Sequence, residues 1–355
     1  MQNQTEPSDK LAKTRTFLDR VREVIARNSF TPIGIFRGGH AQTLAAFAWP
    51  RRWRFRPVQD EERLMQVAPE VQVLAHCRWQ SDRKAHPTMI IWHGIEGSSA
   101  SNYMLSTAHK AFEVGFNVVR MNFRTCGGTD HLTTTIYHGG LTEDLRAVVK
   151  EFIEVDGLTR LFLVGFSLGG NKVLKLAGEN GDEPPAEVIA VCAVSPSIDL
   201  SASSELIMKP SNWIYHRDFV YRLKQRARTK HKLFPHLYDI SGLDHVRTIK
   251  EFDDRYTSRA HGFDGADDYY YRASSIRVID RIRIPTLMIH AMDDPFIPFA
   301  PLRNELIANN HFLLLIATEQ GGHVAFVSAD QKGDADRFWA ENRAVEFCRL
   351  ANESL

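Results

Sequence analysis

The stretch "RLFLVGFSLGG", residues 160–170, decides the fold. Its first half is a short, continuous apolar run, which is typical of a strand buried on both faces of a parallel sheet. The next five residues, "GFSLG", match the pattern G-x-S-x-G, in which a serine occupies a sharp turn between a strand and a helix. Small residues on both sides let the strand and the helix pass closely. Because the turn places the hydroxyl at a helix N-terminus, where negative charge is favoured, Ser167 is the candidate nucleophile.

Other apolar runs surround this stretch and alternate with helical patterns. They are "VQVLAHCRW", "TMIIWHG", "FNVVRMNF", "VIAVCAVS", "TLMIHAM" and "HFLLLIA". Apolar residues recur at helical spacing within residues 141–152 and 168–177. This alternation of strands and helices predicts an α/β fold with a mostly parallel, doubly wound sheet.

The alternation of strand and helix patterns stops between about residues 199 and 275, where the sequence is polar and aromatic and lacks buried-strand runs. Strands resume at "RIRIPTLMIH", and the core does not close without them, so we interpret the stretch as an inserted helical cap. A separate domain is the weaker alternative. Residues 1–50 are expected to form an N-terminal helical arm before the main domain of residues 51–355. The amphipathic pattern of residues 9–27 favours packing on that domain, with peripheral membrane contact as the alternative.

Composition narrows the class of protein. The chain has 355 residues, of which 43% are hydrophobic and 25% charged, with a formal net charge of +1. We expect no nucleic-acid partner, because there is no basic excess. No apolar run approaches the roughly 20 residues of a transmembrane helix, and the first residues lack the pattern of a signal peptide. A cytoplasmic location with reduced thiols is predicted from four widely spaced cysteines without a CxxC motif, Cys77, Cys126, Cys192 and Cys348.

A serine hydroxyl is a weak nucleophile unless a base takes its proton, and that base needs an orienting acid. When the nucleophile occupies such a turn, the acid and then the histidine follow it in the chain. The run "TLMIHAMDDPFIP" ends a later strand with Asp293 and Asp294, and "HFLLLIATEQGGHVAF" places His323 after the next one. Pro295 favours an extended conformation at Asp294, which would hold that carboxylate in one direction. Asp293 is then expected to bond backbone N–H groups of its own turn.

An acyl-transfer site also needs two N–H donors for the oxyanion. One is the backbone N–H of Leu168, the residue after the nucleophile. The second is expected in "HGIEG", which follows an earlier strand, and Ile95 is the best candidate there. His93 is an alternative base, but its place before the nucleophile in the chain argues against that role.

Several further blocks accompany these motifs between about residues 30 and 330. They include "FRGGHAQTL", "HGIEGSSASNY", "NFRTCGGTD", "YHGGLTEDL", "GFSLGGNKVLKLAGE", "SPSIDL", "HGFDGADDYY", "DDPFIP" and "GGHVAF". With them the chain resembles the α/β-hydrolase superfamily, and within it the YheT-like esterases and the ABHD1/ABHD3-like group. The resemblance implies a Ser-His-Asp hydrolase of acyl esters, sometimes lipids or medium-chain acyl groups. It assigns the triad to Ser167, His323 and an aspartate of the "DDP" pair, with Asp294 favoured because it directly precedes Pro295. Relatives often carry glycine in place of Thr125, a departure expected to adjust a loop.

No cofactor and no metal are predicted. The sequence has no HExxH motif, no Cys/His cluster at zinc spacing and no glycine-rich nucleotide loop. His131 and His138 flank a strand-to-helix connection, where a metal role is disfavoured. Acyl transfer by a triad needs neither kind of group.

The leading hypothesis is therefore a serine hydrolase that cleaves small-molecule carboxylic esters with apolar, short- to medium-chain acyl groups through an acyl-enzyme. Acyl transfer and thioester hydrolysis share that intermediate and remain alternatives. A non-catalytic binding protein of the same fold is less favoured, because all three triad residues are present. The aromatic residues of the cap either line an acyl pocket or hold the cap to the core; they are Trp213, Tyr215, Phe219, Tyr221 and residues 269–271. The oligomeric state is not predicted.

Overall fold

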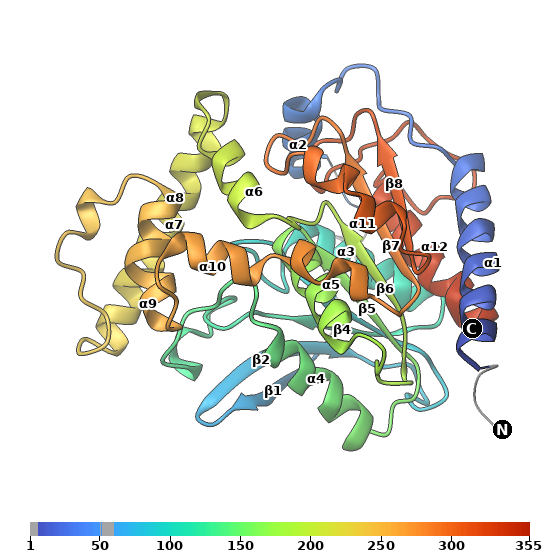
Figure 1. Ribbon diagram of the computed structural model, residues 1–355, viewed down its shortest axis with the longest axis horizontal. Coiled ribbons are helices and arrows are strands. Elements are labelled where there is room, and N and C mark those ends of the chain that lie inside the picture. Colours follow the sequence, from blue (N-terminus) through green and yellow to red (C-terminus); the bar gives the residue numbers. More distant parts are fainter. Residues whose placement is uncertain (1–5, 50, 52–59) are drawn as a thin grey trace.

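A sheet of eight strands forms the centre of the protein (Figure 1) in the order β1-β2-β4-β3-β5-β6-β7-β8. The computed structural model describes residues 6–49, 51 and 60–355. Strand β2 is antiparallel to its neighbours β1 and β4, and all other neighbouring strands are parallel. This confirms the predicted mostly parallel sheet. The strands are β1 (Glu61–Ala68), β2 (Val71–Arg78), β3 (Thr88–Trp92), β4 (Asn117–Met121), β5 (Leu161–Phe166), β6 (Val188–Val194), β7 (Thr286–Ala291) and β8 (Leu313–Thr318).

Strand β1 is the one strand of this sheet that the sequence pattern did not indicate. It lies at the edge of the sheet and pairs only with β2. Most of its side chains are exposed or half-buried, and Met65 alone is buried. An edge strand with so little apolar surface leaves no alternation strong enough to recognise.

Helices cover both faces of the sheet, because successive side chains of each strand point to opposite faces. On β3, Ile90 packs into the apolar cluster on one side, and Met89 and Ile91 pack into the cluster on the other. The first cluster is covered by α4 (Thr142–Glu154), α5 (Leu168–Asn180) and the short α11 (Glu305–Ala308). The second is covered by α1 (Glu6–Arg27), α3 (Asn102–Glu113) and α12 (Trp339–Ser354).

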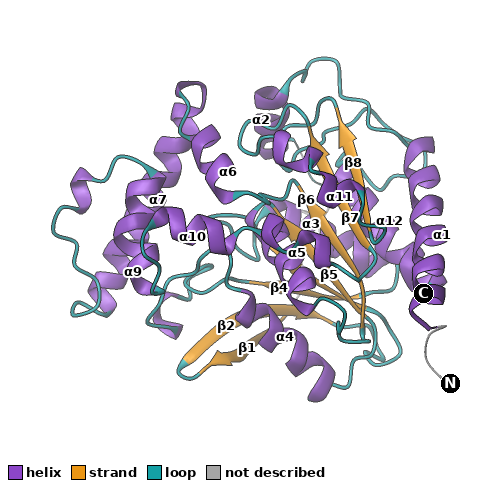
Figure 2. Cartoon of the chain, viewed as in Figure 1, coloured by secondary structure: helices purple, strands orange, loops and turns teal. Residues whose placement is uncertain are grey.

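The predicted helical insertion lies between β6 and β7. Residues 195–285, all of which are described, form helices and loops without a strand (Figure 2). A separate apolar cluster around Phe252 joins most of these helices to one another and to Ile297 of the core, whereas the last helix, residues 266–273, packs into the first cluster of the sheet. The helices are α6 (Leu200–Ile207), α7 (Trp213–Leu233), α8 (Ile249–Phe252), α9 (Ser258–Ala260) and α10 (Ala266–Ala273), with a π-helical turn at Asp253–Thr257.

The N-terminal segment packs on the sheet. The apolar side chains of α1, including Phe17 and Val21, are buried, and the helix lies against α12 and β8. A membrane contact by α1 would therefore depend on its charged face. Helix α2 (Gly39–Ala48) follows, and residue 50, where we expect the arm to end, lies outside the described residues. No helix of the described chain is both long and apolar enough to cross a bilayer.

Candidate active site

The structure brings together the three side chains that the sequence singled out. Ser167 lies between β5 and α5, Asp294 follows β7, and His323 follows β8. His323 Nε2 is 2.9 Å from Ser167 Oγ, and His323 Nδ1 is 2.8 Å from Asp294 Oδ2. The strands concerned are parallel, so their carboxyl ends deliver all three residues to one edge of the sheet.

The two neighbouring aspartates have different partners. Asp294 Oδ1 accepts the backbone N–H groups of Phe296 and Ile297 at 2.8 and 3.0 Å, and its other oxygen faces the histidine. Asp293 Oδ1 instead accepts the N–H of Gly322, on the loop after β8, at 2.9 Å. The expectation that Asp293 bonds its own turn holds only for its own N–H, because Asp294 takes the N–H groups of Phe296 and Ile297 while Asp293 faces the loop after β8.

Electrostatics also separates the two carboxyl groups. Burial raises the pKa of Asp294, but His323, His290 and the backbone donors outweigh burial and leave its pKa below the usual range. Burial is the main cause that raises the pKa of Asp293. Asp294 is thus the group that stays a carboxylate beside the imidazole.

The loop after β3 passes directly beside the serine. A Cβ atom on Gly94 would lie 3.0 Å from Ser167 Cβ. The Gly94 carbonyl accepts the N–H of Gly97 at 3.2 Å and lies 2.7 Å from His93 Nδ1. In a trans peptide the N–H of Ile95 points away from that carbonyl, so these contacts fix its direction.

His93 is occupied elsewhere and does not compete as a base. Its Nε2 accepts the backbone N–H of Phe123 at 3.1 Å, so the proton of the neutral ring is on Nδ1, which faces the Gly94 carbonyl. The ring is fully buried, and burial lowers the pKa of His93 to about 3. His93 therefore holds the loop as a neutral imidazole.

Residues of α2 support the histidine loop, a role that sequence reasoning missed. The N–H of His323 donates to Thr43 Oγ1 at 2.9 Å. The side chain of Gln42 accepts the N–H of Val327 at 2.8 Å and donates to the Val327 carbonyl at 3.2 Å. Both residues lie in the block "FRGGHAQTL", which the sequence analysis had singled out. Nothing in that block indicates that it contacts the loop of His323.

Comparison with known proteins agrees with this geometry. A family model described as the alpha/beta hydrolase fold matches residues 87–330. This chain belongs to the alpha/beta hydrolase family.

Individual relatives indicate which kind of alpha/beta hydrolase this chain resembles. The putative esterase YheT of Escherichia coli is 33% identical over 90% of this chain and 92% of its own length. Phospholipase ABHD3 of Bos taurus is 30% identical over 69% of this chain, but the match spans only 60% of that protein. An esterase structure from Pyrococcus furiosus shares the fold, with a TM-score of 0.52 and 16% identity over 76% of this chain and 84% of its own. The chain is an alpha/beta hydrolase of the esterase and lipase type, similar to YheT and ABHD3.

Two pockets of this hydrolase meet at Ser167. One lies beneath the cap and is mostly apolar, with walls that include Ile95, Leu168, Ile207 and Leu223. The other also reaches Ser167, and its walls include Thr43, Arg51, Asn102, Phe296 and His323.

The aromatic residues of the cap divide between the two roles considered for them. Tyr269 and Tyr270 line the pocket beneath the cap, and Phe219 lines the second pocket. Trp213, Tyr221 and Tyr271 are exposed, with 58–59% of each accessible. Tyr215 packs edge-on against Phe296 at 4.8 Å and so joins the cap to the core.

The two histidines considered for a metal role lie in different surroundings. The ring of His138 packs against those of His261, Phe263 and Tyr269, and His131 lies on the short turn Asp130–Leu132. Among the described residues, no group of three or more histidine, cysteine or acidic side chains is arranged to hold a metal ion.

A buried carboxyl group lies in the wall of the pocket beneath the cap. Asp253 accepts hydrogen bonds from the hydroxyls of Thr257 and Tyr270, each at 2.7 Å. Burial raises its pKa to about 6, although both donors oppose that shift. Folding is therefore penalised when Asp253 carries its charge.

This penalty predicts a pH dependence of stability. The unfolded carboxyl ionises near pH 4 and the folded one near pH 6, so its contribution falls as pH rises through this window and stays low above it. In Asp253→Asn the titrating group is gone. The free energy of unfolding of this variant, relative to wild type, should increase by roughly 2–3 kcal/mol from pH 4 to pH 7. Urea titrations of both proteins across this range measure the difference, and a difference independent of pH would contradict the prediction.

Proposed function

We propose that this protein hydrolyses carboxylic esters with Ser167 as nucleophile, His323 as general base and Asp294 as the orienting acid. The observation that carries the proposal is the continuous hydrogen-bond chain from Ser167 Oγ through the His323 ring to Asp294, with distances of 2.9 and 2.8 Å. The names of the related proteins, esterase and phospholipase, support the same class of reaction.

In the first half-reaction, Ser167 Oγ bonds to the ester carbonyl carbon while its proton passes to His323 Nε2. Asp294 stabilises the imidazolium that forms. The carbonyl π electrons move to oxygen, and the oxyanion accepts the backbone N–H groups of Ile95 and Leu168. Collapse breaks the bond to the leaving alcohol, which takes the proton from Nε2.

In the second half-reaction, a water molecule repeats these steps on the acyl-enzyme. His323 takes a proton from the water, the new tetrahedral intermediate collapses, and the carboxylic acid leaves as Ser167 regains its proton. Acyl transfer and thioester hydrolysis would use the same acyl-enzyme and differ in the acceptor or the leaving group. A non-catalytic binding protein would have no use for the aligned triad.

For the substrate, we propose apolar acyl groups of short to medium length. The pocket beneath the cap offers the apolar wall that such a chain requires, and the second pocket at Ser167 would take the alcohol portion. We keep the cytoplasm as the proposed location, since all four cysteines are unpaired and buried.

The central test is Ser167→Ala. Without the hydroxyl no acyl-enzyme forms, and kcat for p-nitrophenyl butyrate should fall by roughly 10⁶, the scale seen for nucleophile loss in a serine protease. Labelling by a fluorophosphonate probe should disappear as well. The matched control is Ser81→Ala, at an exposed serine in the loop after β2, which should retain full activity. Activity of Ser167→Ala within tenfold of wild type would remove this serine from the mechanism.

A second comparison separates the adjacent aspartates. In Asp294→Asn the amide no longer favours the tautomer that the base needs, and kcat should fall by roughly 10⁴. In Asp293→Asn the amide oxygen still accepts the N–H of Gly322, so kcat should fall far less. Steady-state kinetics and melting curves of both variants decide the matter. The reverse order of kcat, with equal melting temperatures, would show that Asp293 is the acid.

The acyl pocket is tested by p-nitrophenyl esters of increasing chain length. Each buried CH₂ contributes up to about 0.8 kcal/mol, so kcat/KM should rise by up to about fourfold per added carbon until the pocket is full. Ile207→Phe adds bulk to the pocket wall and should move the optimum to a shorter chain. Equal kcat/KM for acetyl and octanoyl esters in both proteins would argue against an acyl pocket.

A further inference from the structure

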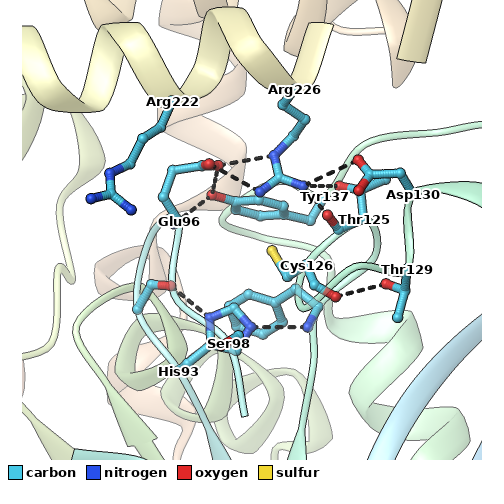
Figure 3. Close-up of polar contacts among 12 residues, drawn as sticks. His93, Glu96, Ser98, Thr125, Cys126, Thr129, Asp130, Tyr137, Arg222 and Arg226 are labelled. Atoms are coloured by element: carbon cyan, nitrogen blue, oxygen red, sulfur yellow. Dashed lines mark hydrogen bonds and ion pairs between the residues drawn. The ribbon is translucent and has the colours of Figure 1, made fainter. Parts of the chain in front are cut away.

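An arginine of the cap reaches the loop that carries Ile95. Figure 3 shows Arg226 of α7 above Glu96, with the Arg226 side chain directed toward that loop. Arg226 Nε and Nη2 donate to the two carboxylate oxygens of Glu96 at 3.0 and 2.9 Å. The side chains of Arg226 and Glu96 are only 10% and 6% exposed. A bidentate pair removed from water in this way is both directional and poorly screened by salt.

The backbone of Glu96 is held at the same point. Its φ of 52° lies in the left-handed region, which residues other than glycine adopt at a cost in free energy. Its N–H donates to the Tyr137 hydroxyl at 2.9 Å, and that hydroxyl donates to Glu96 Oε1 at 2.8 Å. The carboxylate clamped by Arg226 therefore anchors, through Tyr137, the backbone that directly follows Ile95.

The opposite end of the loop is anchored to the core alone. The N–H of Gly94 donates to the Tyr103 hydroxyl at 2.9 Å, and the ring of His93 holds the Gly94 carbonyl. The Ile95 N–H thus lies between an end fixed by core residues and an end fixed by a residue of the cap.

Thr125 gives the arginine a further anchor. Arg226 Nη1 donates to the Thr125 hydroxyl at 2.8 Å and also to the Thr125 carbonyl oxygen. Thr125 has a φ of 64°, a conformation that favours glycine, which is the residue that the family resemblance leads us to expect at this position. The threonine of this chain adds a hydroxyl acceptor that glycine lacks. Through this hydroxyl the loop after β4 is connected to the cap.

We propose that Arg226 is a positioning residue for ester hydrolysis: by clamping Glu96 it holds the Ile95 N–H where the oxyanion develops. The inference rests on the proposed function, since it assigns Ile95 to the oxyanion site. The site for the oxyanion is then complete only when α7 is seated on the core. If the clamp were merely structural, its loss would lower the stability of the fold or weaken substrate binding. Loss of a positioning residue instead weakens the stabilisation of the tetrahedral state.

The test compares Arg226→Gln with Arg222→Gln. Arg222 lies one turn earlier on the same helix, to one side of the cluster (Figure 3), and pairs with Asp218 at the surface at 2.7 Å. Both changes remove one positive charge from α7. For p-nitrophenyl butyrate, kcat of Arg226→Gln should fall roughly 10- to 100-fold, below the loss expected for a missing oxyanion donor, with KM within about threefold. Arg222→Gln should keep the wild-type kcat.

An alkyl boronic acid gives a readout of the tetrahedral state. Ser167 Oγ bonds to boron, its proton passes to His323, and the boron becomes tetrahedral and anionic with an oxygen in the oxyanion site. Its inhibition constant should weaken in Arg226→Gln in parallel with the loss of kcat. Glu96→Gln should show the same pattern, and the double variant should be no slower than the slower single variant, because both changes break one contact.

Three results would overturn the inference. These are a kcat of Arg226→Gln equal to that of Arg222→Gln, a rise in KM with kcat preserved, or a loss of kcat with unchanged boronic acid affinity. If Arg226→Gln does not fold, Arg226→Lys and Thr125→Val replace it, since each removes part of the clamp; full activity of both would count against the proposal. Failure of the proposed function itself looks different, because wild-type protein would then show neither ester turnover nor labelling at Ser167.

Discussion

The site depends on how closely the backbone packs around the turn at Ser167. A Cβ atom on Gly165 would lie 2.3 Å from the Gly169 carbonyl oxygen, and one on Gly169 would lie 2.5 Å from the His93 carbonyl oxygen. No side chain fits in these gaps, so strand β5, helix α5 and the loop after β3 meet through backbone alone. Ser167 itself has a φ of 54°, a strained conformation that persists because β5 is paired on both sides, with β3 and β6. The serine, the Ile95 loop and the helix N-terminus are thereby held within a few ångströms of one another.

This packing explains why so much could be predicted from the sequence. Buried parallel strands leave continuous apolar runs, and functional groups follow their carboxyl ends, so the order of Ser167, Asp294 and His323 could be read along the chain. Pro295 restricts the residue before it, and the structure indeed turns Asp294, and not Asp293, toward the histidine. What could be predicted was set by local rules of strand, turn and proline.

What could not be predicted depends on contacts between distant segments. Thr43 binds the backbone of His323, a residue 280 positions later, and Arg226 binds Glu96 across 130 positions. The local sequence around Thr43 or Glu96 does not indicate which distant residue it contacts. Strand β1 escaped prediction for a related reason: its pairing with β2, and not its own apolar pattern, makes it a strand.

Polar contacts join the cap to the core on both sides of the site. On the loop after β4, Lys230 donates to the Asp130 carbonyl at 3.0 Å and Tyr238 donates to the Thr134 carbonyl at 2.8 Å, beside the Arg226 clamp. Near the acid, Asn212 donates to the Pro295 carbonyl at 2.7 Å, and the rings of Tyr215 and Phe296 pack together.

Hydrogen bonds thus fix the cap where it borders the Ile95 loop. A buried charge or carbonyl left unpaired there would cost free energy of folding. Cap residues thus line the apolar pocket beside Ser167 and also clamp Glu96, next to Ile95. Under the proposed function, acyl selection and stabilisation of the tetrahedral state would both depend on how the cap packs on the core.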